Sequence, residues 1–163
     1  MSNDEKKAKA HELQLKRNKV MLSFLCKFYP NLFTEDKKNI KPLQNKIFFL
    51  IRQDFIKKNL LTAKTYWKKY GYAFLRWYTS QLQYHVAVLR NKTRFGLNGQ
   101  AAEVLIKDHK NYSYTEIQNA ISRISKQNNP KVKKMIRFLM AICKKYNWQR
   151  QNTRKFQNHA YKG

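Results

Sequence analysis

Two neighbouring segments decide the fold that the sequence predicts: Trp77-Tyr78-Thr79-Ser80-Gln81-Leu82-Gln83 and Thr93-Arg94-Phe95-Gly96-Leu97-Asn98-Gly99. Residues 80–83 have the pattern Ser-x-x-Gln, which is typical of a capping box and predicts a helix from there to about Arg90. Asn98-Gly99 is a strong hairpin-turn signal, so we expect strands over 93–97 and 100–106. The two segments therefore place a helix N-terminus close to a β-hairpin.

Apolar residues at helical spacing predict further helices on both sides of these segments. One covers 20–28 and ends before Pro30, and the next is opened by Lys41-Pro42 and continues to Phe55. Another begins at a Thr62 cap. A second capping box over 113–116, Ser-x-x-Glu, opens a helix to Ile124, and a last helix covers 132–143. The expected fold class is α+β and predominantly helical, with a short β-hairpin and extra N- and C-terminal helices.

These patterns divide the chain into four parts. Residues 1–19 form a basic N-terminal extension, either disordered or a solvated helix continuous with the next segment. The main domain covers 20–113, and a helical hairpin over 114–147 either docks on it or makes a dimer. Residues 148–163 lack periodicity and read as a basic disordered tail, in which three aromatic residues could stack on bases: Trp148, Phe156 and Tyr161.

The charge of the chain points to a polyanionic partner. Lys and Arg together number 35 against 9 Asp and Glu, a formal net charge of +26. No acidic residue occurs between Asp54 and Glu103, and none follows Glu116. A surface made only for solubility would mix the two signs, so this surplus favours nucleic acid.

Several site classes have no support in the sequence. Cys26 and Cys143 are far apart, and the four histidines show no metal spacing, so we expect reduced thiols, no metal and no cofactor. Residues 1–10 do not resemble a signal peptide, and apolar runs such as 47–51 are too short to cross a bilayer. These features predict a cytoplasmic protein.

A candidate binding site follows from the helix start at Ser80. A helix N-terminus presents free N–H groups and a partial positive charge, which suit a phosphate. Tyr84 supplies a ring that can stack, and Arg94 supplies a planar cation. Lys68 and Arg76 share one helix face that leads toward Ser80. From the residues alone, Tyr84 could equally fill the core, and the cations could simply be solvated.

The ordered motifs resemble those of the ProQ/FinO family of bacterial RNA chaperones. The resemblance runs from Val20 to Ser113. Lys46 stands where the family usually has glycine, Gly96 where Asp is common, and Asn98 where the turn usually has Asp. The motifs that carry the resemblance are Phe28-Tyr29-Pro30-Asn31-Leu32-Phe33, Lys41-Pro42-Leu43 with Ile47, Tyr78-Thr79-Ser80, Tyr84, Thr93-Arg94 and Leu97-Asn98-Gly99.

The resemblance implies a FinO-like domain that binds RNA and is not an enzyme. Such proteins hold the lower stem and single-stranded 3′ tail of terminator-like hairpins in small or antisense RNAs and mRNAs, stabilise them and promote RNA–RNA pairing in post-transcriptional regulation. The RNA-binding residues that it implies are Lys68, Arg76, Tyr78, Thr79, Ser80, Tyr84, Thr93 and Arg94.

Three other functions have some support in the sequence. A DNA-binding regulator is the main alternative, although a predicted hairpin interrupts the region where a helix-turn-helix would lie. A metal nuclease needs clustered carboxylates, which the centre of the chain lacks, and His85 with His109 is the only plausible acid–base pair. The amphipathic cationic helix over 132–145 could bind a membrane surface, but a folded core argues against this as the main role.

Overall fold

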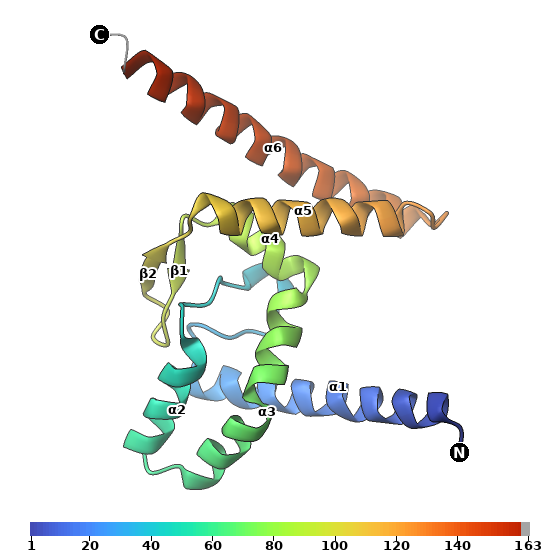
Figure 1. Ribbon diagram of the computed structural model, residues 1–163, viewed down its shortest axis with the longest axis vertical. Coiled ribbons are helices and arrows are strands. Elements are labelled where there is room, and N and C mark those ends of the chain that lie inside the picture. Colours follow the sequence, from blue (N-terminus) through green and yellow to red (C-terminus); the bar gives the residue numbers. More distant parts are fainter. Residues whose placement is uncertain (161–163) are drawn as a thin grey trace.

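Helices dominate the computed structural model of the protein, which describes residues 1–160, with side chains described up to Thr153 (Figure 1). The predicted α+β class with one short antiparallel hairpin is confirmed. The elements in chain order are α1 (Asn3–Phe28), the 3₁₀ helix η1 (Lys37–Asn39), α2 (Ile47–Lys57), α3 (Leu61–Ser80), α4 (Leu82–Arg90), β1 (Thr93–Phe95), β2 (Ala101–Val104), α5 (Lys107–Ile124) and α6 (Pro130–Ala160).

An aromatic core joins α1, α2 and α3. Trp67 is fully buried at its centre, and its indole Nε1 donates a hydrogen bond to the Phe48 carbonyl at 2.9 Å. Gly71 permits this packing, because a Cβ there would lie 2.7 Å from the Trp67 ring and 3.0 Å from that of Phe48. The core continues into Phe74 and Tyr78, both without exposed surface. It therefore fixes the C-terminal end of α3, where the candidate site begins.

A second apolar cluster joins α4 to the two C-terminal helices. Val86 and Leu89 of α4 pack with Ile117 of α5 and Leu139 of α6, all of them buried. The Tyr146 hydroxyl donates to Asn111 Oδ1 at 2.7 Å and ties α6 to α5. Of the two alternatives for the C-terminal helices, docking on the rest of the chain is the one observed.

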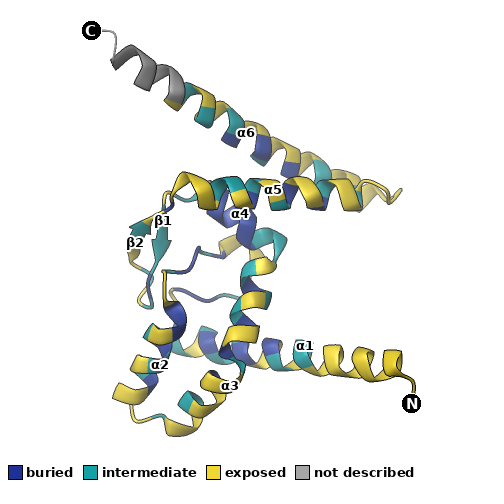
Figure 2. Ribbon diagram, in the orientation of Figure 1, coloured by how far each residue is buried: buried dark blue, intermediate teal, exposed yellow. Residues whose placement is uncertain are grey.

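Both ends of the chain are more helical than the sequence indicated. α1 starts at a capping box in which Ser2 Oγ accepts from Glu5 N, so the helical alternative for 1–19 holds. Its first half extends past the core and is exposed (Figures 1 and 2). α6 continues to Ala160 where a disordered tail was predicted, because no Gly or Pro interrupts the chain after Pro130 until Gly163. The predicted stacking roles of Phe156 and Tyr161 lie outside the described side chains.

The predicted division of the chain at 19, 113 and 147 stays a prediction. None of these positions is a helix boundary: α1 continues through the first, α5 through the second and α6 through the third.

Three predicted helix starts are displaced. The segment after Lys41 is extended and lies beside β1, where Phe95 N donates to the Pro42 carbonyl at 2.8 Å, so α2 begins only at Ile47. α3 begins at Leu61, and no side chain, including that of Thr62, caps it. α5 begins at Lys107 instead of at the predicted Ser113 capping box.

The hairpin is shorter than predicted and its turn is of another kind. Within the turn only Gly99 has a positive φ, of 78°, and its N–H donates to the Gly96 carbonyl at 2.9 Å. This is a turn with glycine at its fourth position, instead of a type I′ turn with two positive φ values. A Cβ on Gly99 would also lie 2.7 Å from the Asn31 carbonyl oxygen. The turn is therefore fixed by its contact with the loop before η1.

Lys46 occupies a left-handed position, with φ 60° and ψ 23°, immediately before α2. This conformation disfavours a side chain, which explains why the family usually has glycine there. We expect Lys46→Gly to raise the free energy of unfolding by about 1 kcal/mol, measured by urea denaturation. Lys46→Ala removes the same charge but keeps the Cβ, so it should give no such gain. Equal stabilisation by both substitutions would contradict this explanation.

Candidate functional site

A hollow of about 410 Å³ lies at the junction of α3 and α4 and is closed on one side by α5. We call it the junction pocket. Its lining comes from four elements, and the residues are Arg76, Thr79, Ser80, Tyr84, His85, Val88, Arg94, His109, Tyr112, Ser113 and Glu116. It thus brings together five of the residues that the sequence singled out, namely Arg76, Thr79, Ser80, Tyr84 and Arg94.

The predicted capping box at Ser80 is wrong. Ser80 is the last residue of α3, and its hydroxyl donates to the Trp77 carbonyl at 2.9 Å; Thr79 likewise donates to Leu75 at 2.8 Å. Bonding to the preceding helical turn is the common competitor of capping for these side chains. α4 starts after Gln81, and no side chain caps it. The first N–H groups of α4 are therefore free of side-chain partners, and they retain the partial positive charge of a helix start.

Tyr84 lies at the floor of the pocket with 6% of its surface exposed. Its hydroxyl accepts a hydrogen bond from the buried backbone N–H of Leu43 at 2.9 Å. Burial raises the pKa of this hydroxyl. The predicted stacking of the Tyr84 ring on a base does not fit this placement, because too little of the ring is exposed. Tyr84 instead joins the pocket to the core.

Arg94 connects three parts of the site. Its Nη1 donates to the Leu43 carbonyl at 2.9 Å, and its Nη2 lies 3.0 Å from His109 Nδ1. Because a guanidinium can only donate, His109 Nδ1 must be the acceptor, so the neutral ring carries its proton on Nε2. Two of the five N–H groups of Arg94 make these two bonds.

The remaining predicted residues lie outside the pocket lining. Lys68 is exposed on α3, about two turns before Arg76. Thr93 is half-buried on β1, opposite Val104. Tyr78 is fully buried in the core, and its hydroxyl has no hydrogen-bond partner. Its burial rules out a direct contact with a ligand, so the predicted binding role of Tyr78 is corrected to support of the α3 end.

Four residues of α5 also line the pocket, and sequence reasoning gave none of them this role. His109, Tyr112, Ser113 and Glu116 follow the spacing i, i+3, i+4, i+7, which places them on one helix face. Extending the helix back to Lys107 would have revealed this face. Tyr112 is 62% exposed and presents an accessible ring at the pocket. Ser113, predicted as a cap, is buried instead.

His85 holds α4 to α5 below the pocket. Its Nδ1 lies 3.0 Å from Ser113 Oγ, and both residues are buried. Burial lowers the pKa of His85, and the neighbouring Glu116 carboxylate partly opposes this. His85 is therefore uncharged at neutral pH. His85 and His109 do line one pocket, but the Nδ1 atom of each already makes a structural hydrogen bond.

The electrostatics of the surface leave most cations without an acidic partner. Among the described side chains the ion pairs are Glu12–Lys16 and Asp54–Lys58, both remote from the junction pocket in sequence. Glu116 is the one acidic residue among the lining side chains. The pocket therefore combines two arginines with a single carboxylate.

Two further findings concern metals and membranes. Among the side chains described, which end at Thr153, no cluster of His, Cys, Asp and Glu has the arrangement of a metal site. Among the described helices, none has both the length and the apolar character needed to cross a bilayer.

Comparison with protein families identifies the family of the chain. The model of the ProQ/FINO family matches residues 15–134, which is more than half of the chain. This region contains all of the junction pocket. None of the curated proteins compared with the chain matches it significantly.

Proposed function

The chain belongs to the ProQ/FINO family of RNA-binding chaperones, and from this premise we propose that it holds the 3′ end of a structured RNA in the junction pocket. The observation that carries the proposal is the convergence of cations, an exposed ring and a carboxylate on one hollow. These are the groups that a terminal nucleotide needs for its phosphate, base and ribose. No catalytic role is proposed for any of them.

The phosphates of the RNA would contact Arg76 and Arg94. Arg76 is exposed, and Arg94 has donors left beyond its bonds to Leu43 and His109. The fork of N–H donors on an arginine side chain suits phosphate groups. Lys68 would extend this surface along α3 toward the lower stem. Such contacts release counterions, so the affinity should decrease as the salt concentration rises.

The terminal base would stack on Tyr112, which takes the role that the sequence assigned to Tyr84. Tyr112 is 62% exposed, against 6% for Tyr84. Stacking on an aromatic ring tolerates any base, because every base has a π-face. The pocket would thus recognise an RNA end with little dependence on sequence.

The terminal ribose would bind Glu116. A carboxylate accepts hydrogen bonds but cannot donate them, so it suits the free 2′ and 3′ hydroxyls of an RNA end. The same carboxylate repels a terminal phosphate. Glu116 would therefore select an RNA whose last ribose is unmodified, and the 2′ hydroxyl would distinguish RNA from DNA.

We propose that the cellular role is post-transcriptional, in the bacterial cytoplasm. The preferred RNAs would be terminator-like hairpins with a single-stranded 3′ tail, in small or antisense RNAs and mRNAs. Cations without acidic partners would reduce the repulsion between two RNAs and so promote their pairing. No membrane or small-molecule partner is proposed.

Tyr112→Ala tests this use of the pocket. We expect the affinity for a hairpin with a U-rich 3′ tail to fall about tenfold, because one stacking contact is lost. Tyr72→Ala is the matched control: it removes another exposed tyrosine, 56% exposed on α3, outside the junction pocket. Fluorescence anisotropy measures binding, and circular dichroism confirms folding. Equal effects of the two substitutions would contradict the stacking role.

The same titration separates the RNA proposal from the DNA-binding alternative. Duplex DNA offers neither an unpaired 3′ ribose nor 2′ hydroxyls, so it should bind more weakly than the hairpin at each salt concentration. Equal affinity for duplex DNA would favour a DNA-binding regulatory protein.

A further inference from the structure

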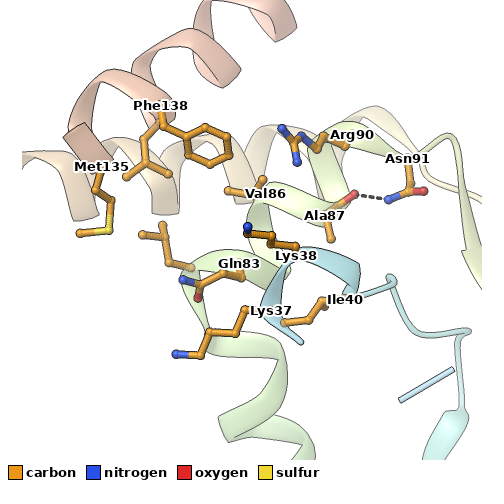
Figure 3. Close-up of a pocket in the computed structure, with 12 residues that line it drawn as sticks. Lys37, Lys38, Ile40, Gln83, Val86, Ala87, Arg90, Asn91, Met135 and Phe138 are labelled. Atoms are coloured by element: carbon orange, nitrogen blue, oxygen red, sulfur yellow. Dashed lines mark hydrogen bonds between the residues drawn. The ribbon is translucent and has the colours of Figure 1, made fainter. Parts of the chain in front are cut away.

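A second hollow, of about 420 Å³, lies between η1, α4 and α6 (Figure 3). We call it the α6 groove. Its α4 lining includes Gln83, Val86 and Arg90, whereas the junction pocket uses Tyr84, His85 and Val88 of the same helix. At helical spacing these two sets lie on opposite sides of α4. The two hollows are therefore separated by the width of one helix, about 10–12 Å.

The α6 groove combines an apolar floor with a cationic rim. Lys37, Lys38 and Arg90 contribute the cations, and none of its twelve lining residues is acidic. Phe138 of α6 is 44% exposed, and the Arg90 guanidinium lies over its ring, 5.2 Å from the centroid. Figure 3 shows Phe138 and Met135 on α6 across the hollow from the η1 lysines. An accessible ring among cations suits a ligand that is flat and apolar in one part and anionic in another.

An unpaired nucleotide has this chemistry. Its base can stack on Phe138, its phosphates can contact the η1 lysines, and the Gln83 amide can hydrogen-bond a base edge. Stacked bases in a duplex keep their faces covered, so a double strand could not use the ring. The volume of the groove falls in the range of small-ligand sites, about 300–1,000 Å³. An apolar peptide would fill the floor but leave the three cations without a partner.

We propose that the α6 groove binds an unpaired nucleotide of the same RNA whose 3′ end occupies the junction pocket, an inference that rests on the proposed function. One RNA can reach both hollows because only α4 separates them. A strand that continues from the other side of the stem would place its first unpaired nucleotide in the groove. Phe138 and Met135 lie beyond residue 134, so this site adds a surface outside the region matched by the family.

The test compares Phe138→Ala with Met140→Ala in the full chain. Met140 lies on the same helix, is 57% exposed and does not line the groove. The probes are two hairpins with the same U-rich 3′ tail, one with three unpaired nucleotides on the 5′ side of the stem and one without. We expect Phe138→Ala to weaken binding of the hairpin with the 5′ nucleotides about tenfold, because that complex loses a stacked base. Binding of the hairpin without them should stay unchanged. Met140→Ala should change neither.

Lys38→Gln provides a second variant that removes a cation and leaves the apolar packing of α6 intact. It should weaken binding of the hairpin with the 5′ nucleotides severalfold at low salt, with less effect on the hairpin without them. The proposal would be overturned if Phe138→Ala and Lys38→Gln left the binding of the two hairpins unchanged. It would also be overturned if these variants weakened the binding of the two hairpins equally. A dimer of the free protein that Phe138→Ala abolishes would also overturn it, by showing a second copy of the chain in the groove. If the protein still preferred a 3′-hydroxyl end in those cases, the proposal for the junction pocket would stand and only the proposal for the α6 groove would fail.

Discussion

Tyr84→Ala should lower the free energy of unfolding by about 3–5 kcal/mol, the range for removing a large buried aromatic side chain. The ring is 6% exposed and packs edge-on against Tyr78, with 6.0 Å between the ring centroids. Its loss would leave a cavity between the end of α3 and the segment around Leu43. Urea denaturation measures the change. RNA binding by this variant would report mainly on its folding, so it cannot assign a contact to the ring.

Tyr84→Phe separates the hydroxyl from the ring. It keeps the packing but leaves the buried Leu43 N–H without its acceptor, which costs about 1–3 kcal/mol. Tyr112→Phe is the matched control, because it removes a hydroxyl from an exposed tyrosine and should change stability little. If Tyr84→Phe were as stable as the native protein, the Leu43–Tyr84 hydrogen bond would not be the link between pocket and core that we infer.

Local sequence signals pointed to residues that the fold brings together at one hollow, but the roles predicted for some of them do not fit their burial. One capping pattern and one turn pattern predicted that the segment around Ser80, the helix after it and Arg94 lie close together. The sequence predicts a stacking role for Tyr84 because the hydrogen bond that buries its hydroxyl cannot be seen from local patterns. The partner in that bond, Leu43, lies 41 positions away in the sequence. A contact of that kind depends on how the extended segment around Leu43 lies beside β1, and no periodicity reports it.

The two capping boxes show why such signals failed. Ser80 and Ser113 both have the residue pattern of an N-cap, yet Ser80 ends α3 and Ser113 lies inside α5. In the fold, Ser113 bonds to His85, and the preceding Tyr112 packs edge-on against the same His85 ring, with 5.8 Å between the ring centroids. Tertiary packing outweighed a capping preference of about 1 kcal/mol. Tyr112 and Glu116 therefore lie on a face of α5 that the Ser113 capping pattern does not predict.

Lys46 shows the opposite case, in which a departure from the family pattern had a structural meaning. The backbone there keeps the left-handed conformation that glycine would favour, although the residue is lysine. The surrounding packing of Ile47 and Leu43 fixes this conformation. The departure therefore affects stability and does not change the fold.

The central claim is that the junction pocket holds an unmodified 3′ end of RNA. The most direct measurement compares one hairpin carrying a 3′-hydroxyl, a 3′-phosphate or a 2′,3′-cyclic phosphate, at a salt concentration that suppresses non-specific binding. We expect the native protein to bind both modified ends about 10- to 100-fold more weakly, because each loses hydroxyl donors to Glu116 and the phosphate meets a like charge. Glu116→Gln should lose most of this preference while the fold remains intact. Equal binding of the three RNAs by the native protein would contradict the claim and leave only a basic RNA-binding surface.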